Sequence, residues 1–280
     1  MGQKSEILFL LLSQLSVGGI IVLAAISRRQ LGLSFFRLNG LIFFLLMGGG
    51  IIGIPVPESL AATSPGQRVS LLVSTWPGLT IALTLAYSVC LFVYVATFWV
   101  RKGTHATSWL FAAAACGIGM VIVSGLAYGA QLDGGVIAPL IPVNFVFSAL
   151  VLGSALLGML LGHRYLTNPH LPMVHLNVLA WVFLVAVLLQ GGLTVVALAL
   201  AGDWAVVGAA LRIETVLGLF LWIRLVIGIA VPLLLAIMIL NTIRYRANMS
   251  ATGLLYIAAI MVMAGEAFSR YLLLTDAILL

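Results

Sequence analysis

Three charged side chains lie inside stretches of the sequence that are otherwise almost wholly apolar. Glu266 and Arg270 are one helical turn apart in AGEAFSRYLLL, and Arg224 lies in LGLFLWIRLVIGIAV. A charge in the interior of a bilayer costs from about 2.5 kcal/mol upward, so such groups usually face protein or water and pair with each other. They also mark the routes of ions, protons and substrates. We therefore expect these three residues to form a site that handles protons.

The composition places these residues in a membrane. The chain has 280 residues, of which 63% are hydrophobic and 7% charged, and its mean hydropathy is +1.25, well outside the range of soluble domains. A helix that crosses the hydrocarbon core needs about 20 apolar residues. We expect spans at 7–27, 36–54, 74–100, 107–130, 139–162, 175–201, 215–241 and 249–275.

The predicted fold is therefore all-α, a polytopic membrane bundle of about eight helices. It forms a single transmembrane domain over 1–280, with a division into two four-helix bundles over 1–131 and 132–280 as the alternative. Barrel strands are excluded because they would alternate polar and apolar residues in short segments.

The charges of the connecting segments indicate an orientation. The connections after the first, third, fifth and seventh spans hold no acidic residue. Their basic residues are Arg28, Arg29, Arg101, Lys102, Arg164, Arg244 and Arg246, and Arg37 lies at the start of the second span on the same side. Loops rich in Lys and Arg stay in the cytoplasm. Both termini are therefore expected on the outer, periplasmic side. The net charge of +6 is distributed over these loops without interleaved aromatic residues, which excludes a nucleic-acid partner.

The same orientation sets the depth of the polar residues. Arg224 lies about nine residues into its span, which is about 13 Å along the axis, and Glu266 comes out at a similar depth. Four further polar side chains fall in this outer half: Gln14, Asn144, Gln190 and Tyr128. We expect a polar cavity that opens outward, in which these four side chains bind a quinone head group. Glu266, Arg224 and Arg270 would be its catalytic residues, since a quinol must lose two protons as its electrons leave.

A purely structural interpretation of the same residues stays open. In it, Glu266 and Arg270 form an i, i+4 ion pair, Arg224 extends toward the outer surface, and the amides bond between helices.

A second polar concentration is GHRYLTNPHLPMVHL, with His163, His170 and His175. Their spacing allows two or three imidazoles to meet at a metal or a haem on the cytoplasmic side, although that side offers no carboxylate to orient them. Haem within the bilayer would require a histidine well inside each of two spans, and none is found. Cys90 and Cys116 form no CxxC motif, so iron–sulfur chemistry would belong to a partner.

Three segments carry a resemblance to a known family: SQLSVGGIIVLAA at 13–25, WIRLVIGIAVPLLL at 222–235 and AGEAFSRYLL at 264–273. The chain resembles the membrane-anchor subunits of the polysulfide reductase (NrfD-like) and dimethyl sulfoxide reductase group, as a divergent relative. The resemblance implies a haem-free subunit in a bacterial or archaeal cytoplasmic membrane. Such a subunit exchanges electrons with quinone and passes them to an iron–sulfur or cytochrome partner on the outer side. The histidine stretch departs from this pattern.

Two other function classes remain. A transporter or proton-conducting protein would use Arg224, Glu266 and Arg270 as a relay and would work as an isolated subunit. Interrupted helices in matching halves would favour it, and Gly48 to Gly50 with Pro55 and Pro232 indicate breaks, but these do not match between the two halves. A structural assembly subunit would lose no turnover when Glu266 is replaced.

Overall fold

The computed structural model describes residues 2–26, 31–56, 71–72, 74–100, 105–131, 137–168, 173–200, 208 and 212–276, and every regular element in these ranges is a helix. The helices are α1 (Gly2–Ala24), α3 (Leu33–Ile51), α6 (Trp76–Val100), α7 (Ala106–Gly129), α8 (Leu140–Thr167), α9 (Val174–Leu200), α11 (Val216–Leu225), η1 (Val226–Ala230), α12 (Val231–Arg244) and α13 (Asn248–Asp276). With α11, η1 and α12 taken as one continuous stretch, the described residues contain eight helices long and apolar enough to cross a membrane. The predicted all-α fold is confirmed.

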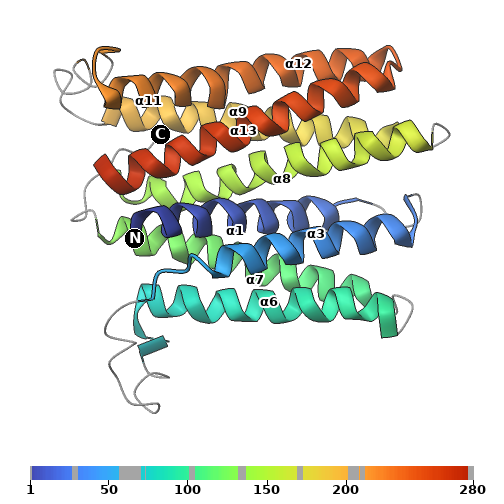
Figure 1. Cartoon of the computed structure of the whole chain (residues 1–280), viewed down its shortest axis with the longest axis horizontal. Coiled ribbons are helices and arrows are strands. Elements are labelled where there is room, and N and C mark those ends of the chain that lie inside the picture. The colour runs from blue at the N-terminus through green and yellow to red at the C-terminus, as the bar shows by residue number, and fades with distance from the viewer. Residues whose placement is uncertain are drawn as a thin grey trace.

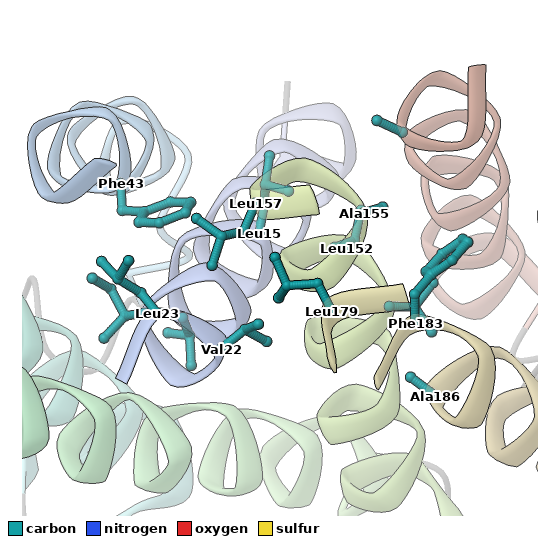
Figure 2. Close-up of a cluster of buried hydrophobic side chains, with 14 of the residues drawn as sticks. Leu15, Val22, Leu23, Phe43, Leu152, Ala155, Leu157, Leu179, Phe183 and Ala186 are labelled. Carbon is teal, nitrogen blue, oxygen red and sulfur yellow. The ribbon is translucent and has the colours of Figure 1, made fainter. Parts of the chain in front are cut away.

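The helices run roughly along the long axis of the molecule, and α1 begins at the same end at which α13 finishes (Figure 1). Helix α1 contacts α3, α7, α8 and α13, whereas α8 contacts α1, α7, α9 and α13. These two helices therefore occupy the centre of the bundle. Figure 2 shows apolar side chains meeting around them, including Leu15 of α1, Phe43 of α3, Leu152 of α8 and Phe183 of α9.

The outer faces of the helices are apolar as well. Exposed side chains include Leu45, Val89, Val195 and Ile260, each with about 60% of its surface accessible or more. A soluble protein keeps such faces polar, because contiguous exposed apolar surface is costly in water. The apolar exterior is consistent with contact to a lipid bilayer.

Helices α1 and α8 approach each other through glycine. A Cβ atom added to Gly153 would lie 2.0 Å from the carbonyl carbon of Gly18, so a larger residue does not fit between the two backbones. Small residues at such crossings let helices pack closely in membranes. The crossing brings Gln14 and Ser148, each about one helical turn away, to the same place in the bundle.

The α-helix of the seventh span is interrupted just before Pro232, the candidate break in this span, by a π-helix that the sequence did not predict. The α-helical hydrogen bonding of α11 gives way to the π-helix η1, and α12 then starts with Pro232 near its first position. Proline lacks an N–H group, and a wide π turn is one way in which a helix accommodates the missing bond. The interruption begins two residues after Arg224, and π turns occur frequently at functional sites.

Candidate functional site

The site forms where η1 and α13 touch. A Cβ atom added to Gly265 would lie 2.2 Å from the Cα atom of Gly228, so only two glycines allow this approach. Gly265 precedes Glu266, and Gly228 lies one turn after Arg224. As a result Arg224 Nη1 donates to Glu266 Oε1 at 2.7 Å, and both side chains are fully buried. The two residues therefore meet, as their similar position along the bundle requires, and the alternative in which Arg224 extends toward the surface is wrong.

Arg270 holds the other oxygen of the same carboxylate. Its Nη2 donates to Glu266 Oε2 at 3.3 Å and to Gln14 Oε1 at 3.0 Å, and its Nη1 donates to Asn144 Oδ1 at 3.2 Å. The guanidinium carbon lies 4.2 Å from the centre of the Phe145 ring, a cation–π contact. The i, i+4 pair is therefore real, but it is one part of a network that draws on α1 and α8.

Two neutral side chains complete the surroundings of the carboxylate. Gln190 Nε2 of α9 donates to Glu266 Oε1 at 2.6 Å. The Ser148 hydroxyl of α8 lies 2.5 Å from Glu266 Oε2 and 2.9 Å from Gln14 Oε1. Because serine has one hydroxyl hydrogen and can also accept, Ser148 donates to one of these two oxygens at a time. Its hydroxyl can thus serve Glu266 either as a donor or as an acceptor.

The network has more donors than acceptors. With Glu266 ionised, it contains one carboxylate and two guanidinium groups, a net charge of +1 among these three side chains. Several buried nitrogen atoms within it find no acceptor among the described residues: Gln14 Nε2, Asn144 Nδ2, Arg224 Nε, Arg224 Nη2 and Arg270 Nε. Unpaired buried donors are costly.

A cavity of about 290 Å³ lies at the end of the bundle where α1 begins. Its polar lining includes Glu6, Thr80, Ser124, Tyr128 and Gln131, and its apolar lining includes Phe9, Ile54 and Ile81. The Tyr128 hydroxyl donates to Glu6 Oε2 at 3.3 Å.

The cavity and the charged network adjoin each other through one aromatic side chain. The Phe145 ring lies 6.0 Å from the Tyr128 ring, centre to centre, and also contacts the Arg270 guanidinium. Phe145 is fully buried. The Tyr128 and Phe145 rings therefore connect the lining of the cavity to Arg270.

Most of the predicted site residues contact one another, but they are buried in the protein interior and do not line a cavity. Gln14, Asn144 and Gln190 join Glu266, Arg224 and Arg270 in one network, whereas Tyr128 binds Glu6 at the cavity instead. We expected Glu266 and the arginines to line an open cavity, but all three have 0% accessible surface. The physical reason is the glycine contact between η1 and α13, which lets the backbones close around the charges.

Two residues of the arrangement were missed from the sequence. Ser148 lies one turn after Asn144 and so shares its helix face, which was a usable signal. Glu6 lies about two turns before Gln14 on α1. Its charge places it at the outer end of the first span, and no feature of the sequence indicates that it reaches a cavity.

The histidine stretch is only partly described. His163 lies near the end of α8, where it is exposed and its Nδ1 is 3.3 Å from the Tyr256 hydroxyl. His175 is buried near the start of α9, and His170 lies outside the described residues. In the described part of the chain, no three His, Cys, Asp or Glu side chains gather as a metal site would require. The three-histidine metal site stays a prediction.

Comparison with known proteins assigns neither a family nor a function to the chain. No protein-family model matches the chain, and no curated protein sequence matches it. The resemblance to polysulfide reductase anchors rests on three short apolar segments, and it stays a prediction.

Proposed function

We propose that the protein is a multi-pass subunit of a bacterial or archaeal cytoplasmic membrane that exchanges electrons with the quinone pool. Its electrons would pass to an iron–sulfur or cytochrome partner subunit on the outer side, where both termini of this chain would also lie. The observation that carries the proposal is the Glu266 carboxylate, which is fully buried and bonded to four side chains from α8, α9, α11 and α13. This network is linked through Phe145 and Tyr128 to a cavity with polar and apolar lining.

The cavity supports the binding of a quinone head group. Such a ring needs apolar walls and a polar group near each of its two oxygens. Phe9 and Ile81 provide apolar lining, the hydrogen-bonded Tyr128 and Glu6 provide polar groups for one ring oxygen, and the cavity also contains Thr80, Ser124 and Gln131 as polar groups for the other. The cavity lies at the end where the sequence places Glu58, Asp133, Asp203 and Glu214 in the connections, which agrees with a site on the outer side.

The network supports proton handling because it can satisfy Glu266 in two protonation states. When the carboxylate is ionised, Ser148 donates to Oε2. When Oε2 carries a proton, that proton can be donated to the Ser148 oxygen while the serine hydrogen turns to Gln14 Oε1, 2.9 Å away. Ser148 can thus form a hydrogen bond with Glu266 both before and after a proton transfer.

The proposed reaction converts quinol to quinone with the release of two protons and two electrons. We assign the first proton to Glu6, whose carboxylate lines the cavity. Glu266 is the proposed acceptor of the second proton, which water would have to carry past the Tyr128 and Phe145 rings because Glu266 does not line the cavity. The electrons leave to the redox group of the partner subunit, since no residue of this chain is assigned a redox role. Arg224 and Arg270 would stabilise the negative charge on Glu266 between proton transfers.

The test begins with the complex isolated in mild detergent, its visible spectrum and an organic extract. We expect bound quinone together with iron–sulfur or haem absorbance from the partner. Quinol oxidation by this complex should fall at least tenfold in Glu266→Gln and remain unchanged in Glu214→Gln, because Glu214 is exposed in the turn before α11. A colourless, quinone-free single chain would contradict the proposal.

One observation favours a second function, proton conduction or transport. The π-helix that begins two residues after Arg224 interrupts a membrane-length helix, and interrupted helices line the binding sites of many transporters. The candidate break at Gly48 is not one, because α3 is continuous over Leu33–Ile51, so the interruption has no counterpart there. For this second function, the isolated chain in liposomes would move protons in response to an imposed potential, and Glu266→Gln would abolish the flux. An electron-transfer anchor would show no such flux without its partner.

A further inference from the structure

A second large cavity lies at the opposite end of the bundle, between α9 and α12. This groove has a volume of about 610 Å³, and its lining includes Asn177, Trp181, Leu184, Ile237, Asn241 and Arg244. It opens sideways, on the exterior of the bundle, since the side chains of Trp181 and Ile237 are each about half exposed. The groove is separate from the network around Glu266, and the proposed function does not use it.

The lining of the groove changes from polar to apolar along both helices. Arg244 is the last residue of α12, Asn241 lies about one turn before it and Ile237 about one turn further. On α9, Asn177 lies in the first turn, with Trp181 and Leu184 deeper. A cationic and amide-bearing rim above an apolar floor matches the division of a phospholipid into head group and acyl chain.

The charge at this end of the bundle selects the kind of head group. The sequence places basic residues and no acidic residue in the connections and helix ends here, namely Arg28, Arg29, Arg37, Arg101, Lys102, Arg164, Arg244 and Arg246. Arg244 is exposed at the rim of the groove. Basic pockets between membrane helices on the cytoplasmic side bind anionic lipid head groups, so a zwitterionic lipid gains less from this surface.

We propose that the groove between α9 and α12 binds an anionic phospholipid. Arg244 holds the phosphate, Asn241 and Asn177 donate hydrogen bonds to the phosphate or glycerol oxygens, and an acyl chain lies along Trp181 and Leu184. The inference stands on the groove and its charges, and it holds whichever function the network around Glu266 performs.

The test uses the full chain, delipidated in detergent and offered phosphatidylglycerol or phosphatidylcholine with identical acyl chains. Retained lipid is counted by native mass spectrometry. We expect phosphatidylglycerol to be retained at least fivefold more strongly, and Arg244→Gln to remove this preference. Arg246→Gln is the matched control, because Arg246 lies two residues away and outside the groove lining. Arg244→Lys should keep most of the preference, since it keeps the charge.

A second variant distinguishes a lipid from a second protein copy as the occupant of the groove. Leu184→Trp fills the apolar floor and should weaken retention of both lipids while the chain stays folded, as followed by its thermal unfolding. Equal retention of the two lipids, or an unchanged preference in Arg244→Gln, would overturn the proposal. It would also be overturned if the chain proved to be a dimer that Leu184→Trp dissociates, because a second copy would then occupy the groove.

Discussion

Gly228 and Gly265 are in backbone contact: a Cβ atom on Gly265 would lie 2.2 Å from the Cα atom of Gly228. Each glycine sits within one turn of a charged residue of the buried network, Gly228 after Arg224 and Gly265 before Glu266. The 2.7 Å ion pair between these charges is therefore possible only while both positions lack a side chain.

Replacing Gly265 with alanine should open this contact. We expect a loss of about 1–3 kcal/mol in the free energy of unfolding, because the added methyl forces the π-helical segment and α13 apart. The measurement is unfolding in mixed detergent micelles. Gly253→Ala on the same helix is the control, because nothing lies within 4 Å of the added methyl, and it should be neutral or stabilising. Equal effects of the two substitutions would refute the backbone contact.

The charge balance of the network predicts an order of destabilisation. Arg224→Met leaves one carboxylate with one guanidinium, whereas Glu266→Gln leaves two buried guanidinium groups without a counter-charge. Removing one partner of a buried pair costs about 3–5 kcal/mol, and we expect Glu266→Gln to lie at the upper end and Arg224→Met below it. The double variant should cost less than the sum of the single ones. Additive effects in this cycle would show that Arg224 and Glu266 do not interact.

Ser148 should affect turnover more than stability. Ser148→Ala removes the hydroxyl that can serve Glu266 as donor or acceptor, and we expect slower quinol oxidation by the complex with a loss of about 1–3 kcal/mol in stability. Ser154→Ala on the same helix is the control, because Ser154 bonds only to the carbonyls of Leu150 and Val151. If both variants turned over like the parent protein, Ser148 would have no part in proton transfer.

Tyr128 and Glu6 should control the affinity for quinone. Tyr128→Phe removes the 3.3 Å hydrogen bond to Glu6 and one polar group of the cavity. We expect KM for quinol to rise severalfold, in line with about 0.5–1.5 kcal/mol for one hydrogen bond, while kcat changes little. Tyr245→Phe, at an exposed site at the other end of the bundle, should leave both constants unchanged. An unchanged KM in Tyr128→Phe would place the quinone elsewhere.

Several features of this protein followed from the sequence alone. The eight membrane-length helices were predictable because each apolar run is long enough by itself to cross a bilayer, without reference to its neighbours. The pairing of Arg224 with Glu266 was also predictable. A helix rises by a fixed distance per residue, so the position of a charge in its span sets its depth, and a charge at that depth requires a partner.

Tertiary structure alone decided whether the charges face a cavity or the protein interior. The role of Ser148 depends on the rotation of α8 about its axis, which side-chain packing sets and hydropathy does not record. The closure of the network depends on glycine contacts between helices far apart in the sequence, Gly18 with Gly153 and Gly228 with Gly265. Depth is a local property of one helix, whereas rotation and lateral contact are properties of pairs of helices, and these pairs form only when the bundle packs.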